Sequence, residues 1–168
     1  MSRASAILGT IVFFFVAPGI VAGVIPWSLS GGQSHARFPG NWILVAIGSA
    51  LIAAGLAALI ASFARFALEG RGTPAPVAPT ADLVTGGLYR FVRNPMYVAV
   101  LAIILGQALA FANLAVLVYG VITFAVVHAF VTLYEEPTLR DTYGASYDAY
   151  VAAVPRWIPR LTPWAGDP

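Results

Sequence analysis

The stretch that decides the fold is residues 81–97, with the sequence ADLVTGGLYRFVRNPMY. It combines arginines, glycines, tyrosines, a proline and an aspartate, whereas the long segments around it are plain apolar runs. It leads into residues 96–134, a run of 39 residues without an acidic residue or an arginine. A second polar cluster, Glu135-Glu136, closes that run. We expect the two clusters to meet at one face of the molecule.

The uncharged run predicts a helical hairpin. A single helix of this length would measure about 58 Å at 1.5 Å per residue, far more than a hydrocarbon core of about 30 Å. The run must therefore fold back, and Phe111-Ala112-Asn113 is the expected turn. The sequence thus predicts a short helix over about 96–111 and a longer one over about 114–134.

The composition is that of a membrane protein. Of the 168 residues, 60% are hydrophobic and 10% are charged, with a mean hydropathy of +0.83. Soluble domains carry about 25% charged residues. With no cysteine and two histidines, we expect no disulfide and no metal site of the usual zinc type. The nine basic residues are all arginines and form no run, so we expect no nucleic-acid partner.

Two further spans are predicted in the first part of the chain, and we assign residues 1–70 to them. Residues 4–25 are uncharged and long enough to cross a bilayer, although a cleaved signal peptide is an alternative. Pro18-Gly19 predicts a kink there, tolerated where neighbouring helices cover the freed carbonyl. Residues 42–64 form the second span, and their small side chains permit close helix contact, including that of a homodimer.

Residues 71–168 form the second region, which contains the hairpin 96–134. It begins with a linker rich in glycine and proline. Its tail predicts an amphipathic surface helix over 138–151, with Tyr143, Tyr147 and Tyr150 on related faces. The fold class is therefore an all-α integral membrane protein with about four transmembrane helices, the last two a hairpin, plus a cytoplasmic C-terminal amphipathic helix.

The arginines predict the orientation. With four spans, eight arginines lie on one side and Arg37 alone lies on the other. Arginine is concentrated in cytoplasmic loops, so both termini and the polar site should face the cytoplasm. All seven acidic residues fall on the same side.

The acidic pair is the first candidate for chemistry. Carboxylates at a helix C-terminus oppose the helix dipole, so Glu135-Glu136 at the end of the last span favours a role such as binding a cation. The alternative is that these side chains, like the arginines and tyrosines nearby, are ordinary solvated anchors at the membrane interface.

A resemblance sharpens this interpretation. The ordered set Leu83-Val84-Thr85-Gly86, Tyr89, Arg93-Asn94-Pro95-x-Tyr97, Glu135-Glu136, Tyr143-Gly144-x-x-Tyr147-x-x-Tyr150 and Val154-Pro155-Arg156 resembles the isoprenylcysteine carboxyl methyltransferases. The related phospholipid N-methyltransferases share the pattern, which covers about residues 81–160.

The resemblance implies S-adenosylmethionine as the cofactor and a membrane lipid or other lipophilic small molecule as the substrate. An ammonium and a sulfonium suit carboxylates and tyrosine faces. Carried over by position, the implied cofactor contacts are Ala81, Asp82, Leu83, Val84, Tyr89, Asn94, Pro95, Met96, Tyr97 and Glu135.

Two positions depart from the family pattern. Asn94 stands where the family has a histidine, and its amide donates hydrogen bonds but does not titrate. Val131 stands where the prenylcysteine enzymes carry a substrate-contacting arginine. The second change favours a neutral or amine-bearing lipid over prenylcysteine.

Other polar residues near the last span complete the candidate set. His128 lies about two turns before Glu135 and is either a functional group deep in the bundle or a neutral side chain bonded to a neighbouring helix. Arg140 follows the pair and either contacts a ligand anion or anchors the chain at the interface. We assign chemistry to Glu135, His128 and Asn94, and substrate contacts to His128, Val131 and Arg140.

The sequence therefore predicts S-adenosylmethionine-dependent methyl transfer to a hydrophobic acceptor in the membrane. An NADPH-dependent sterol-type reductase is the alternative enzyme, because such reductases have a similar tail. A non-catalytic membrane subunit is the alternative outside catalysis.

Overall fold

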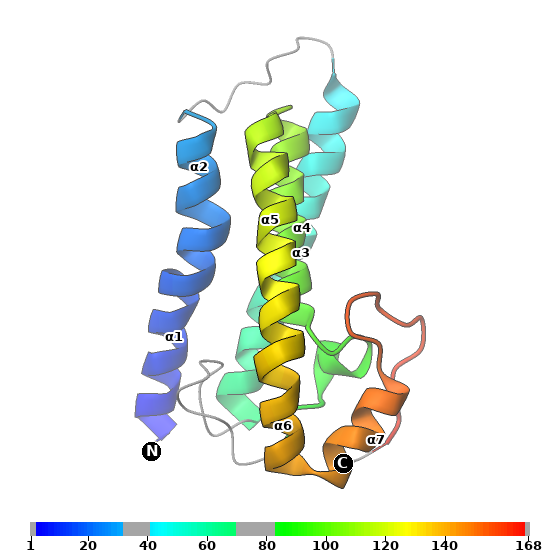
Figure 1. The fold of residues 1–168 in the computed structure, drawn as a ribbon. Helices are drawn as coiled ribbons and strands as arrows, with labels where there is room; N and C mark the ends of the chain where they lie inside the picture. Colours follow the sequence, from blue (N-terminus) through cyan, green and yellow to red (C-terminus); the bar gives the residue numbers. More distant parts are fainter. Residues whose placement is uncertain (1–2, 32–40, 70–82, 167–168) are drawn as a thin grey trace.

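The computed structural model describes residues 3–31, 41–69 and 83–166, and the regular elements in those ranges are all helices (Figure 1). Three stretches are long and apolar enough to cross a membrane: Ile11–Leu29, Trp42–Arg65 and Leu114–Tyr143. The predicted all-α membrane class is confirmed. A fourth full span is not established, because α4 (Pro95–Ala110) has 16 residues and reaches only about 24 Å.

The predicted hairpin is confirmed. Helix α4 ends at Ala110 and α5 (Leu114–Phe130) begins four residues later. Ala112 adopts a φ of 46°, and the side chain of Asn113 caps α5 by accepting hydrogen bonds from the next backbone N–H groups. The chain therefore reverses within three residues, at the predicted place.

The end predicted for the last span is wrong. The helix does not stop before Glu135-Glu136 but continues through a π-helical segment, η3 (Val131–Glu135), into α6 (Glu136–Tyr143). The pair thus lies inside a continuous helix, so its carboxylates do not stand at a helix C-terminus as predicted.

The predicted surface helix over 138–151 is instead two helices. Gly144, with a φ of 55°, separates α6 from α7 (Ala145–Ala153). Glycine is favoured in this conformation because glycine has no side chain to clash with the backbone. The break turns α7 away from α6, as Figure 1 shows.

The first predicted span is present and contains an irregularity. It runs as α1 (Arg3–Gly19), a π-helical segment η1 (Ile20–Val24) and α2 (Ile25–Leu29). The wide turn follows Pro18-Gly19, where the sequence predicted a kink. A proline removes one backbone hydrogen bond of a regular helix and disturbs the turn around it.

Neighbouring helices supply hydrogen bonds to this irregular segment. Gln107 of α4 donates to the carbonyl of Ala22 at 2.7 Å, and Tyr119 of α5 donates to the carbonyl of Val21 at 2.9 Å. Both acceptors lie in η1, so the two side chains fix the first helix against the hairpin.

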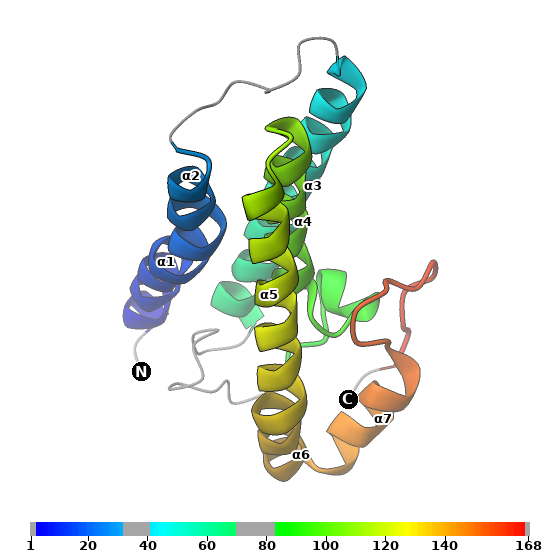
Figure 2. The same cartoon turned by 45° about the horizontal axis from the view of Figure 1, so that its top comes forward.

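Helix α3 (Trp42–Glu69) packs on α4 through glycines, and Figures 1 and 2 both place α4 beside it. A Cβ built on Gly48 would lie 2.5 Å from the carbonyl oxygen of Gly106, and one on Gly106 would lie 2.6 Å from that of Gly48. The small-residue face of this span is therefore used inside the chain. The homodimer stays a prediction and no longer draws support from that face.

We expect Gly48→Ala to destabilise the protein. The new methyl group would meet backbone atoms, which cannot move aside as a flexible side chain does, and overpacking of this kind costs about 1–3 kcal/mol. A thermal unfolding midpoint measured in detergent should fall. Gly23→Ala is the matched control, since a Cβ there meets nothing within 4 Å, and an equal fall in both variants would contradict this packing.

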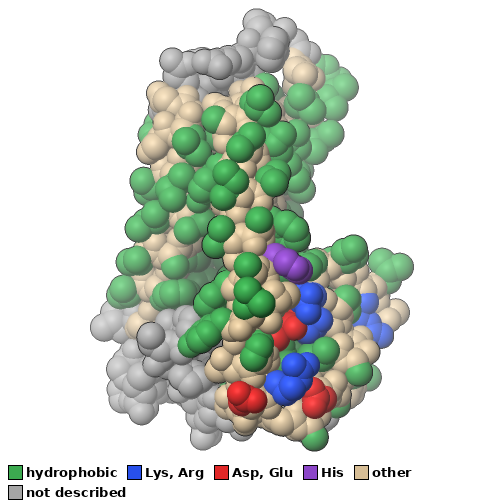
Figure 3. Space-filling view, in the orientation of Figure 1, with side chains coloured by type: hydrophobic (Ala, Val, Ile, Leu, Met, Phe, Trp, Pro, Cys, Tyr) green, Lys and Arg blue, Asp and Glu red, His purple; other side chains and the backbone are tan. Residues whose placement is uncertain are grey.

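The outer surface of the bundle is apolar, and the charged side chains gather at one end. Large hydrophobic residues on the outside include Phe15, Trp42, Leu114 and Val121. Figure 3 shows the charged residues grouped in the lower part of this face, around the tail. Helix α1 begins at that same end (Figure 1).

Candidate active site

A cavity of about 330 Å³ lies between α1, α3, α4 and α5 near the charged end. Most of its wall is apolar, supplied by side chains such as Phe13 of α1 and Leu59 and Phe63 of α3. The polar residues among those that line it are Tyr89, Arg93, Asn94, Tyr97, Thr123 and Glu135. The volume lies in the range of small-molecule sites, and the mixture of a largely apolar wall with a few polar groups is typical of them.

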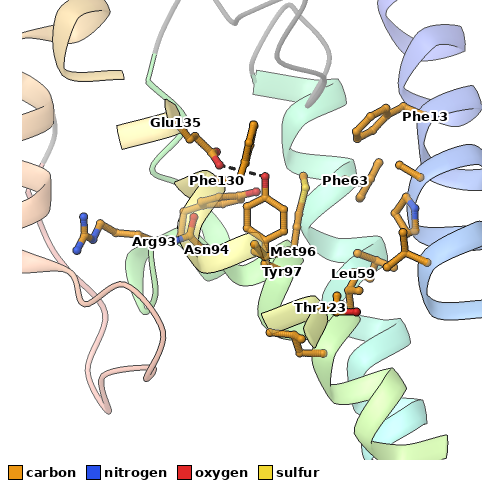
Figure 4. Close-up of a pocket in the computed structure, with 17 residues that line it drawn as sticks. Phe13, Leu59, Phe63, Arg93, Asn94, Met96, Tyr97, Thr123, Phe130 and Glu135 are labelled. Carbon is orange, nitrogen blue, oxygen red and sulfur yellow. Dashed lines mark hydrogen bonds between the residues drawn. The ribbon is translucent and has the colours of Figure 1, made fainter. Parts of the chain in front are cut away.

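The polar groups of the two predicted clusters meet in this cavity. The hydroxyl of Tyr97 donates to Oε2 of Glu135 at 3.0 Å, the hydrogen bond drawn as a dashed line in Figure 4. Residues separated by 38 positions thus become neighbours. The predicted meeting of the two ends of the hairpin is confirmed.

Asn94 connects the cavity to the tail. It immediately precedes α4, is buried with 8% of its surface exposed, and lines the cavity. Its amide nitrogen donates to the carbonyl of Arg156 at 3.2 Å. The amide is therefore held by the tail.

The second glutamate has a different role from the first. Nη1 of Arg93 donates to Oε1 of Glu136 at 2.8 Å, and Arg156 binds the same carboxylate through Nε and Nη2 at 2.7 and 2.9 Å. These hydrogen bonds raise the pKa of the Arg156 guanidinium above its ordinary value, so it stays charged. Figure 4 shows the Arg93 side chain pointing away from the cavity. No sequence pattern marks this network, because Arg93 and Arg156 lie 43 and 20 positions from Glu136.

The tail is bonded along the polar segment that precedes α4. The N–H of Arg93 donates to the carbonyl of Pro155, and the N–H of Arg160 donates to the carbonyl of Phe91, both at 2.9 Å. Arg90 and Trp164 exchange two further bonds, one through the backbone N–H of Trp164 and one through Nε of Arg90. The tail and the residues before Asn94 therefore form one unit that supports the cavity.

Tyr150 of α7 is a buried residue that links the tail region to the segment before Asn94. It is 3% exposed, and its hydroxyl donates to the carbonyl of Tyr89 at 2.7 Å. Burial raises the pKa of the Tyr150 phenol above its ordinary value, and burial does the same for Tyr89. Both phenols therefore stay protonated in the folded protein at neutral and mildly alkaline pH.

We expect Tyr150→Phe to destabilise the protein by about 1–2 kcal/mol, because the Tyr89 carbonyl loses its donor. In wild type, the raised pKa of Tyr150 means that only the unfolded chain ionises near pH 10, so stability falls as the pH rises through that value. The variant should lose less stability over the same alkaline range. Thermal unfolding against pH measures both effects, and parallel curves would contradict the assignment.

The structure brings some of the predicted cofactor residues into the cavity and leaves others outside its wall. Those that line it are Tyr89, Asn94, Met96, Tyr97 and Glu135. Leu83 packs against the tyrosines of α7, while Val84 and Pro95 are buried next to the site without being among its lining residues. Ala81 and Asp82 lie outside the described residues.

The three predicted substrate contacts are not among the residues that line the cavity. His128 accepts a hydrogen bond from Nε1 of Trp157 at 3.0 Å, and Val131 is buried with 1% exposed. Residues seven apart share a face on a regular helix, but the π-helical segment η3 covers residues 131–135, so the regular spacing does not hold between His128 and Glu135. Arg140 is exposed and pairs with Asp148 at 2.8 Å. Their assigned roles gain no support from this geometry.

Helix α1 contributes a wall that the sequence analysis did not foresee. The rings of Phe13 and Phe14 pack on Phe63 of α3, with centroids 6.2 and 4.9 Å apart. Phe13 and Phe63 both line the cavity (Figure 4). The sequence offers only a run of three phenylalanines at 13–15, and such a run does not distinguish a cavity wall from a lipid-facing surface.

Comparison with known proteins gave one family match. A family model described as phospholipid methyltransferase matches residues 43–146, which include all of α3 but its first residue, the hairpin and the Tyr97–Glu135 pair. A search of curated proteins found no match.

Proposed function

Since the chain belongs to the phospholipid methyltransferase family, we propose that it transfers a methyl group from S-adenosylmethionine to a hydrophobic acceptor that remains in the bilayer. Family membership places the chain among methyltransferases with lipid-type substrates and favours this reaction over an NADPH-dependent reduction. The identity of the cofactor and its place in the cavity are the parts we propose.

One observation carries the proposal: a partly buried carboxylate, held by a tyrosine, lines a largely apolar cavity. Glu135 and Tyr97 both line that cavity and are hydrogen-bonded to each other. A carboxylate facing apolar walls attracts a cation more strongly than one in water, because little solvent screens it. The cofactor carries an ammonium and a sulfonium, so the donor set fits it.

The residues divide the cavity into two parts. Glu135, Tyr97 and Asn94 would hold the polar cofactor near the charged end. The walls from α1, α3 and α5, with Phe13, Phe63 and Thr123 among them, would hold the apolar acceptor. When bound, S-adenosylmethionine supplies a methyl group on a sulfonium centre.

The protein's own side chains orient the reactants and keep water away from the reacting centre. Tyr97 fixes one oxygen of Glu135, so the carboxylate is oriented before a ligand arrives. The apolar walls keep water from the reacting centre, which strengthens the electrostatic contacts inside it. Holding both reactants in one orientation provides much of the acceleration for a reaction of this kind.

The proposed orientation puts the cavity on the cytoplasmic side. Arg140 of α6 and the tail residues Arg156 and Arg160 belong to the charged end, where Figure 3 shows the basic side chains gathered. Positive charge concentrates on the cytoplasmic side of membrane proteins. The cofactor would then enter from the cytoplasm and the acceptor from the bilayer.

Calorimetric titration of the intact protein in detergent tests the cofactor. We expect S-adenosylmethionine and its demethylated product to bind and NADPH not to bind. Incubation of proteoliposomes with methyl-labelled S-adenosylmethionine should then transfer label to the lipid fraction. Binding of NADPH alone, or no binding of either compound, would contradict the proposal.

A further inference from the structure

The tail after α7 turns back along the bundle. In Figures 1 and 2, residues 154–164 rise from α7 and lie beside α5. Trp157 makes the contact: its indole nitrogen donates to Nδ1 of His128, and its ring lies 5.5 Å from that of Phe124. The tail is therefore held against a stretch of α5 that belongs to a candidate membrane span.

Trp157 contacts α5 at a depth that lies well inside the membrane-spanning part of the helix. Residues 114–134 are uncharged, and their 21 residues measure about 31 Å as a helix, which matches a hydrocarbon core of about 30 Å. Phe124 and His128 lie about 15 and 21 Å from the start of the span. Trp157 touches both, so it sits more than one helical turn inside the boundary near Tyr134.

Two residues that follow Trp157 in the loop expose apolar side chains. Ile158 is 79% exposed and Leu161 is 98% exposed. Figure 3 shows hydrophobic side chains on the upper edge of the lobe that carries the charged residues, continuous with the apolar flank of the bundle. Large apolar side chains so fully exposed favour a lipid environment over water.

Five of the ten residues 155–164 need no solvent partner at the backbone nitrogen. An irregular segment is tolerated at membrane depth only where its polar groups are satisfied by protein. Three of its residues have no N–H to satisfy: Pro155, Pro159 and Pro163. The N–H groups of Arg160 and Trp164 donate to the carbonyls of Phe91 and Arg90.

The charged residues of the loop are compatible with an interfacial position. Arg156 is bonded to Glu136, and Arg160 donates from Nη1 to the carbonyl of Ala153 at 3.0 Å. Long arginine side chains keep their charged heads near the headgroups while their stems lie along apolar surface. Anionic headgroups would attract both residues.

We propose that residues 155–164 form a re-entrant loop that docks into the bilayer beside α5, with Ile158 and Leu161 among the acyl chains. The loop is bonded to the segment that precedes Asn94, and Asn94 lines the cavity. Docking therefore sets the depth of the cavity relative to the lipid.

Single cysteines test the proposal cleanly, because the chain has none of its own. Leu161→Cys and Ile158→Cys are placed in nanodiscs of phosphatidylcholine and phosphatidylglycerol and treated with a membrane-impermeant maleimide. Ala149→Cys on the exposed part of α7 is the matched control. We expect the loop cysteines to react about ten-fold more slowly than the control, and at the same rate once all variants are unfolded in detergent. Equal rates in nanodiscs would overturn the proposal.

A spin label at position 161 identifies what covers the loop. Frequent collisions with oxygen and rare collisions with a water-soluble nickel complex are expected for lipid. Frequent collisions with nickel would show water, and rare collisions with both reagents would show a protein partner; either result overturns the proposal. Both measurements proceed without cofactor, so they are independent of the proposed reaction.

Discussion

Glu135→Gln should lower the affinity for S-adenosylmethionine by on the order of 10- to 100-fold. The substitution keeps the shape of the side chain and removes its charge from the wall of a largely apolar cavity. Hydrogen bonds to charged groups contribute about 1.5–3 kcal/mol, which corresponds to this range of affinity. Titration calorimetry of the intact protein in detergent measures the change directly.

Two variants separate this effect from general damage. Asp148→Asn neutralises an exposed carboxylate of α7 that pairs with Arg140 outside the cavity, and its affinity should equal that of wild type. Tyr97→Phe leaves the charge of Glu135 but removes its hydroxyl partner, so a smaller loss is expected. Wild-type affinity in Glu135→Gln would refute the cofactor assignment of this residue.

Glu136→Ala should destabilise the protein by about 3–5 kcal/mol, because removal of one partner leaves buried charge unpaired. Glu136 is 8% exposed and its carboxylate binds both Arg93 and Arg156, so the variant leaves two guanidinium groups without their shared partner. For a chain of this length the unfolding midpoint should fall by roughly 10 °C. Thermal unfolding in detergent, followed by circular dichroism, measures the shift.

Arg140→Ala provides the comparison, because its ion pair with Asp148 is exposed and solvent screens it. Its unfolding midpoint should stay unchanged. A double variant, Glu136→Leu with Arg156→Met, should recover part of the lost stability, since it removes one of the two uncompensated charges. A Glu136→Ala protein as stable as wild type would show that the network does not hold the tail to the hairpin.

The hairpin could be predicted because length alone decides it. No membrane accommodates 39 residues of straight apolar helix, and Asn113 is a good cap at the turn. The end of α5 could not be read in the same way. Glu135-Glu136 resembles a stop signal, but Arg93 and Arg156 neutralise the second carboxylate, so the helix continues to the glycine at 144.

The candidate site could be predicted where its residues are polar and belong to motifs with a fixed spacing in the sequence. Asn94, Tyr97 and Glu135 fall in the cavity for that reason. His128 was placed by regular helical spacing, and the π-helical turn, which leaves no clear mark in the sequence, changes that spacing. Phe63 was missed because apolar residues on the inner and outer faces of a span look alike in sequence.

The central claim is that the two ends of the hairpin form one cofactor pocket. Ultraviolet crosslinking of methyl-labelled S-adenosylmethionine to the wild-type protein, followed by tryptic mapping, tests it most directly. We predict label on the peptide 94–140, at positions near Tyr97 or Glu135, and its loss with excess demethylated product. Label confined to other peptides, or label that the product does not displace, would contradict the account.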